Sequence, residues 1–135
     1  MYAEYGVSPD ILRAIATVES SMTPDALNCG NRNGSCDYGL MQINSLWEKY
    51  VGDELWNGMA DPCTNVKLGA WILAKNFHRR GATWESVGYY NSSREKARNR
   101  YAHKVRRAYV EIIGKPPPLT GNRYKRPPYA SQGGE

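Results

Sequence analysis

The chain has 135 residues, of which 41% are hydrophobic, so it is long and apolar enough for one domain with its own core and is not a disordered chain. Its sequence contains no stretch that approaches the length of a membrane-spanning helix. The formal net charge of +5 is uneven, because residues 1–93 carry seven Lys and Arg against ten Asp and Glu, whereas residues 94–135 carry eleven against three.

The first predicted helix carries a carboxylate on its apolar face. Ser8 is a good N-cap and Pro9 suits the first helical position, so the helix begins here. Burial raises the pKa of a carboxyl group, and a carboxylic acid that keeps its proton near neutral pH can act as a general acid. The alternative is that Glu19 lies at the helix end and reaches water. The apolar residues that share a face with Glu19 at helical spacing are Leu12, Ile15 and Ala16.

A long polar loop is predicted at residues 23–38, and its length favours a functional role over simple connection. Cys29 and Cys36 flank a run of turn-forming residues, and a disulfide between them would fix the loop that leads to Asp37. Such a bond indicates an oxidising compartment such as the periplasm. Cys63 makes the count odd, and the alternative is three ordinary reduced thiols.

The rest of the domain is predicted to be helical, without a convincing strand. A Ser-x-x-Glu capping box predicts a helix from Ser45, and an Asp-Pro pair predicts a longer helix that follows Asp61 and ends at Gly81. Thr83 is the expected cap of a short helix, and a last helix is expected at about residues 93–113. The predicted fold class is therefore all-α, a compact helical domain with a substrate cleft and little or no sheet.

The segment 115–135 differs in kind from residues 1–114, which form the predicted domain. It holds five of the eight prolines and only one large aliphatic residue, so it is expected to be an extended or flexible basic tail. The alternative is an arm that docks on a partner through its basic and tyrosine residues.

Four short motifs follow one another along these elements. They are Glu19-Ser20, the run Gly-Leu-Met-Gln-Ile-Asn at residues 39–44, Tyr-Tyr-Asn at residues 89–91, and Tyr101 in the last helix. In this order, and with the run Asp-Pro-Cys-Thr-Asn at residues 61–65, the chain resembles the lytic transglycosylases of the lysozyme-like (SLT-type) superfamily. It looks most similar to the small specialised members that accompany type III and type IV secretion systems, pili and conjugation machines.

This resemblance implies cleavage of the β-1,4 bond between N-acetylmuramic acid and N-acetylglucosamine in peptidoglycan. Glu19 would protonate the leaving oxygen and then, as a base, activate the 6-hydroxyl of the same muramic acid, which gives a 1,6-anhydro product. No cofactor is implied. A metal site is not expected, because His78 and His103 have no Cys or carboxylate partner at metal-ligand spacing.

Asp37 is a second candidate catalytic carboxylate, 18 residues after Glu19. Lysozymes place their second carboxylate after a similar connection, so the nearest alternative is a lysozyme-type muramidase that hydrolyses the same bond with both residues. Asp37 equally suits a structural role in the turn that follows it. The sequence does not choose between these two roles.

The resemblance also implies supporting roles for residues of the first two motifs. Ser20 would orient Glu19, and Gly39 would let the backbone pass close to the sugar. Met41 and Gln42 would line the cleft, with Gln42 able to form a hydrogen bond to the substrate. Each of these residues also has an ordinary packing role as its alternative, most strongly Met41.

The opposite wall of the cleft is implied by the later motifs. Tyr90 and Asn91 would hold the sugar and the glutamate, and Tyr101 would close this wall with its hydroxyl near the catalytic carboxylate. The resemblance implies alanine at the position where this chain has Tyr89, so this wall departs from the family's pattern.

An enzyme of this kind acts on glycan strands in the periplasm and must be restrained, so the resemblance implies a secretion-system structural protein, with type III secretion expected, that localises or activates it. The chain is expected to be a monomer. Its start lacks an apolar signal segment, which we expect to reflect removal or truncation. Relatives often pair the cysteine of Asp-Pro-Cys with one near the mature N-terminus, which is absent here.

Two functions outside catalysis are also considered. One is a peptidoglycan-binding assembly module whose cleavage activity is vestigial. The other is nucleic-acid binding through residues 94–107, which hold seven basic residues against one acidic residue. That segment also has an apolar face and is typical of an amphipathic helix with a solvated basic side, so nucleic acid is not the expected partner.

Overall fold

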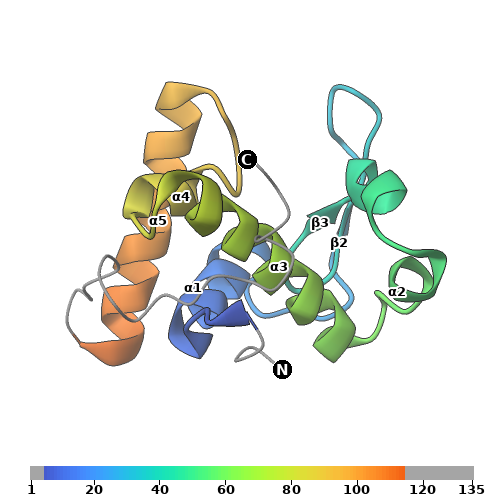
Figure 1. The fold of residues 1–135 in the computed structure, drawn as a ribbon, viewed down its shortest axis with the longest axis horizontal. Helices are drawn as coiled ribbons and strands as arrows, with labels where there is room; N and C mark the ends of the chain where they lie inside the picture. Colours follow the sequence, from blue (N-terminus) through green and yellow to red (C-terminus); the bar gives the residue numbers. More distant parts are fainter. Residues whose placement is uncertain (1–4, 115–135) are drawn as a thin grey trace.

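The computed structural model describes residues 5–114, which form a mostly helical domain with one small sheet (Figure 1). The predicted helical fold class is confirmed, and the expected tail at residues 115–135 lies outside the described residues. The helices of the described part are α1 (Pro9–Ser20), α2 (Asp53–Asn57), α3 (Pro62–Arg80), α4 (Trp84–Gly88), α5 (Glu95–Ile113) and the 3-10 helix η2 (Ser45–Tyr50). Three two-residue strands, β1 (Leu27–Asn28), β2 (Asp37–Tyr38) and β3 (Ile43–Asn44), pair antiparallel in the order β1-β2-β3.

Helices α1, α4 and α5 form the helical side of the domain (Figure 1). The Oγ of Ser8 accepts a hydrogen bond from the backbone N–H of Asp10 at 3.1 Å, as the cap of α1 predicted from the sequence requires. Helix α1 packs against α5, and α4 covers another side of α5. The buried apolar residues of these two long helices are Ile11, Leu12, Ala14, Ile15 and Ala16 in α1 and Tyr101, Val105, Ala108 and Tyr109 in α5.

Helix α3 runs through the middle of the molecule, between the helical side and the sheet with α2 (Figure 1). Its predicted ends are confirmed, because Asp61 caps it through a 3.0 Å hydrogen bond from the N–H of Thr64, and Gly81 ends it with φ of 94°. Thr83 likewise caps α4. None of the helices within residues 5–114 has both the length and the apolarity needed to cross a bilayer.

The prediction of a helix capped by Ser45 is wrong in two respects. The segment is a 3-10 helix, and its cap is Asn44, whose Oδ1 accepts from the N–H of Leu46 at 2.9 Å. The Oγ of Ser45 instead accepts from the N–H of Cys36 at 3.1 Å. Asn44 is already extended because it pairs in β3, so the chain turns into the helix one residue earlier than the pattern predicts.

Candidate functional site

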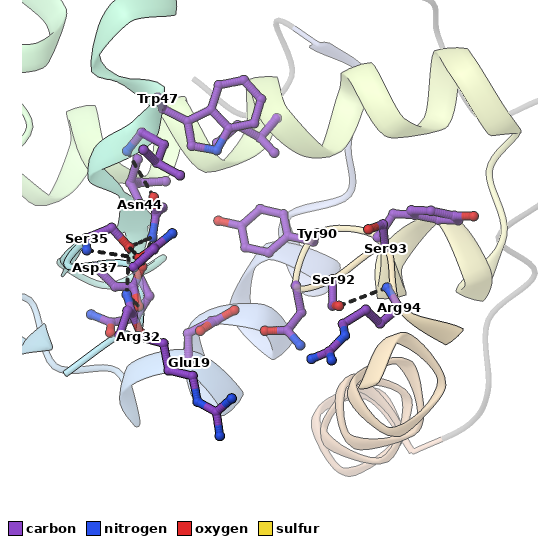
Figure 2. A pocket seen from close by; sticks show the side chains of 18 residues that line it. Glu19, Arg32, Ser35, Asp37, Asn44, Trp47, Tyr90, Ser92, Ser93 and Arg94 are labelled. Carbon is purple, nitrogen blue, oxygen red and sulfur yellow. Dashed lines mark hydrogen bonds between the residues drawn. The ribbon is translucent and has the colours of Figure 1, made fainter. Parts of the chain in front are cut away.

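A cleft of about 730 Å³ lies between the sheet and the connection from α4 to α5. Figure 2 shows Arg32, Asp37 and Asn44 on one wall, Tyr90 and Arg94 on the other, and Glu19 pointing into the space between them. The residues that line the cleft are Glu19, Asn31, Arg32, Asn33, Ser35, Asp37, Gln42, Ile43, Asn44, Leu46, Trp47, Ile72, Tyr89, Tyr90, Asn91, Ser92, Ser93 and Arg94.

Glu19 lies in the last turn of α1 and is half-buried at the cleft. Its pKa is raised from 4.5 to about 7, chiefly by burial. A hydrogen bond from Tyr101 lowers the pKa, and the nearby charge of Asp37 raises it further. The expectation that the helix carries this carboxylate on its apolar side therefore holds, and the group keeps a large share of its proton at neutral pH.

Two tyrosines support Glu19 from the side of α5. The hydroxyl of Tyr101 donates to Oε2 of Glu19 at 2.6 Å. The ring of Tyr101 stacks on Tyr90, with ring centroids 6.4 Å apart and planes at 10°, and the hydroxyl of Tyr90 donates to the backbone carbonyl of Met41 at 2.9 Å. Burial, followed by the charge of Glu19, raises the pKa of both hydroxyls well above the usual range, so both stay protonated as donors.

Asn65, a residue that the sequence analysis did not single out, clamps the turn after β2. Its side chain is 1% exposed, accepts from the N–H of Met41 at 2.8 Å, and donates to the carbonyl of Tyr38 at 2.9 Å. Gly39 between them has φ of 79°, and a Cβ there would lie 2.3 Å from Nδ2 of Asn65. The need for glycine thus comes from Asn65 and from the left-handed backbone, whereas the sequence analysis attributed it to the sugar.

Ser20 and Gln42 form hydrogen bonds to backbone carbonyl groups of the turn, whereas Met41 is part of the core. The Oγ of Ser20 donates to the carbonyl of Leu40 at 2.9 Å, which ties the end of α1, next to Glu19, to the turn. The Met41 side chain is fully buried against Gly69, so the expectation that it lines the cleft is wrong. Gln42 does line the cleft, with φ of 51°, and its amide donates to the carbonyl of Gly39 at 3.0 Å.

Asp37 is held in a polar network on the sheet wall. Its carboxylate oxygens accept from the side-chain amides of Asn31 at 3.1 Å and Asn44 at 2.8 Å. The same two amides donate to Ser35, at 3.1 and 2.9 Å. This network holds the carboxylate of Asp37 in place as a hydrogen-bond acceptor at the cleft. Asp37 therefore has a structural role, which is compatible with a catalytic role as well.

The predicted disulfide between Cys29 and Cys36 is present, with Cα atoms 4.0 Å apart. It closes the loop that leads to Asp37. Cys63, at the start of α3, is exposed and forms no disulfide within residues 5–114.

The opposite wall is anchored by Tyr89. Its ring lies between two guanidinium groups, with the Cζ of Arg80 at 3.7 Å and that of Arg98 at 4.5 Å from the ring centroid. Arg98 also donates to the carbonyl of Ser93 at 2.9 Å. Glycine at position 88 allows Arg98 to pack closely against α4, because a Cβ there would lie 2.6 Å from Arg98. The wall that carries Tyr90 and Asn91 is therefore fixed to α3 and α5.

Trp47 gives the cleft an apolar surface. The indole lines the cleft and packs edge-on against Trp71, with centroids 5.6 Å apart. An indole facing such a space can stack on a sugar ring. Within residues 5–114, no group of three or more His, Cys, Asp or Glu side chains is placed to hold a metal ion.

Comparison with known proteins agrees with this architecture. The sequence profile of the family described as "Transglycosylase SLT domain" matches residues 2–112. The chain is 39% identical over 117 residues to "Invasion protein IagB" of Salmonella typhimurium strain SL1344, across 82% of this chain and 72% of that protein. It is 35% identical over 115 residues to "Protein IpgF" of Shigella flexneri, across 80% and 75%. A "Peptidoglycan-binding-like protein" of Escherichia coli O157:H7 is 35% identical over 121 residues, across 80% and 72%. The chain therefore belongs to the transglycosylase SLT domain family.

Proposed function

We propose that the protein is a peptidoglycan lytic transglycosylase and that Glu19 is its catalytic acid and base. The observation that carries this proposal is the state of Glu19, whose pKa of about 7 lets it donate a proton near neutral pH inside a cleft large enough for several sugar rings. Membership of the transglycosylase SLT domain family supports the same reaction.

The contacts of Glu19 suit both halves of the reaction. In the first half, the protonated carboxyl group donates its proton to the glycosidic oxygen, and the bond to the muramic acid carbon breaks. The carboxylate that remains keeps the 2.6 Å hydrogen bond from Tyr101, which stabilises its charge. In the second half it takes the proton of the muramic acid 6-hydroxyl while that oxygen bonds to the anomeric carbon. The anhydro sugar leaves, and Glu19 is protonated again.

A lysozyme-type muramidase is the second candidate, and a specific observation favours it. Asp37 lines the same cleft as Glu19 and is close enough for its charge to raise the pKa of Glu19. Two carboxyl groups in unlike surroundings can divide the work of hydrolysis between an acid and a stabilising anion. Against this, Asp37 already accepts hydrogen bonds from both Asn31 and Asn44, which suits a structural anion.

The cellular role proposed is local opening of the cell wall for a secretion apparatus, in the periplasm, with a structural protein of that apparatus as the partner. The relative named as an invasion protein is compatible with this role, and the relative named peptidoglycan-binding-like is compatible with the substrate. The disulfide between Cys29 and Cys36 suits an oxidising compartment.

Mass spectrometry of the fragments released from purified peptidoglycan tests the activity. The native protein, Glu19→Gln and Asp37→Asn are compared, with Glu54→Gln on the exposed face of α2 as the matched control. We expect anhydro-muramyl fragments from the native protein and the control and none from Glu19→Gln. Hydrated reducing ends that disappear with Asp37→Asn would identify a muramidase. Binding without fragments from any of the four proteins, with a secretion partner present, would identify a binding module.

A further inference from the structure

Two arginines stand on opposite walls of the cleft, and neither takes part in the chemistry described above. Arg32 belongs to the loop closed by the disulfide, and Arg94 precedes α5. Both line the cleft and both are exposed. Figure 2 shows their side chains on either side of Glu19, one from each wall.

The guanidinium groups of both arginines have no partner within residues 5–114. Two other arginines of this part of the chain form ion pairs, Arg13 with Asp10 at 3.1 Å and Arg98 with Glu85 at 3.3 Å. Arg32 and Arg94 form neither an ion pair nor a side-chain hydrogen bond there, although Glu19 and Asp37 line the same cleft. Their positive charge is therefore available to a ligand.

The backbone at both positions is fixed while the side chains are free. Around Arg32, the disulfide closes the loop and the N–H of Gly34 donates to the carbonyl of Asn31 at 3.0 Å. The N–H of Arg94 donates to Oγ of Ser92 at 3.0 Å, and its carbonyl accepts from the N–H of Arg98 at 2.8 Å. Two guanidinium groups presented in this way can bind anions on both sides of one polymer strand.

The anions that a peptidoglycan strand offers are the carboxylates of its stem peptides, because the lactyl carboxyl group of each muramic acid is bound as an amide to its peptide. We propose that Arg32 and Arg94 bind carboxylates of the stem peptides that flank the bond held at Glu19, and that the protein therefore prefers peptide-bearing strands to bare glycan. This inference rests on the proposed function for its substrate.

Binding is measured in the Glu19→Gln background, which prevents cleavage, to three substrates. These are intact peptidoglycan, peptidoglycan whose carboxylates have been chemically amidated, and strands stripped of peptides by an amidase, whose newly freed lactyl carboxylates are then amidated as well. We expect the pair Arg32→Gln and Arg94→Gln to weaken binding to intact peptidoglycan roughly threefold to tenfold and to leave binding to the other two substrates unchanged. The matched control removes two charges from the exposed face of α5, outside the cleft lining, with Arg100→Gln and Arg106→Gln.

Three results would overturn the proposal. They are equal binding of intact and amidated peptidoglycan, an equal loss from the control pair, and a loss that persists on the stripped and amidated strands. Failure of the proposed function is distinct, because it appears as the absence of fragments from the protein with native Glu19, whatever the binding results are.

Discussion

Replacing the carboxyl group of Glu19, the proposed catalytic acid, by an amide is expected to stabilise the protein at alkaline pH and to have little effect at acid pH. The pKa of Glu19 is about 7 in the folded protein against 4.5 for an ordinary glutamate, so the folded state binds this proton more tightly than the unfolded state does. The stability that this contributes is fully present below about pH 4.5 and is lost as the pH rises through 7. Glu19→Gln has no such loss, because the amide stays neutral and its oxygen can still accept the hydrogen bond from Tyr101.

The size of the effect follows from the same two pKa values. At about 1.4 kcal/mol for each pH unit between 4.5 and about 7, a fully buried group would give about 3 kcal/mol. Glu19 is half-buried at an open cleft, where solvent screens part of this energy, so we expect a difference of roughly 1–2 kcal/mol.

Urea unfolding of the native protein and of Glu19→Gln at about pH 4 and about pH 8 measures this difference. Every other titratable group is shared, so the change in the difference between the two pH values belongs to Glu19. The control Glu54→Gln alters an exposed carboxylate of α2 and should show no comparable change. If Glu19→Gln is no more stable than the native protein at about pH 8, the carboxyl group is not desolvated in the way argued here, and its role as an acid loses its physical basis.

Three further predictions concern the groups that hold the site. Tyr101→Phe removes the hydrogen bond that lowers the pKa of Glu19, so the alkaline limb of the pH–rate profile should move up by about one pH unit; an unmoved limb would contradict the assigned contact. Asn65→Ala leaves two backbone groups of the turn after β2 without their partner and should cost about 2–4 kcal/mol in urea unfolding, whereas a loss below about 1 kcal/mol would show that water replaces the clamp. Gly88→Ala forces α4 away from Arg98 and should cost about 1–3 kcal/mol while slowing fragment release, and unchanged unfolding and release would show that this wall is soft.

The sequence by itself predicted the ends of α1 and α3, the start of α4, and Glu19 as the candidate acid. Ser8, Asp61 and Thr83 cap helices through hydrogen bonds to residues two or three positions away, so their signals are local and the structure confirms them. The place of Glu19 on the apolar side of α1 follows from helical spacing in the same way. The disulfide between Cys29 and Cys36 also lies within one short loop.

Only the tertiary structure decided what surrounds that acid. The three strands have two residues each, too few for an alternating pattern, and pairing in β3 moved the cap of η2 from Ser45 to Asn44. The contact of Tyr101 with Glu19 was expected only from the family resemblance, because it spans 82 residues of sequence and nothing near either residue specifies its 2.6 Å geometry. The clamp by Asn65 likewise joins α3 to a turn that is distant in sequence. Caps and helical phase depend on neighbours in the chain, whereas the burial and hydrogen bonds that raise a pKa to about 7 exist only once distant segments have packed.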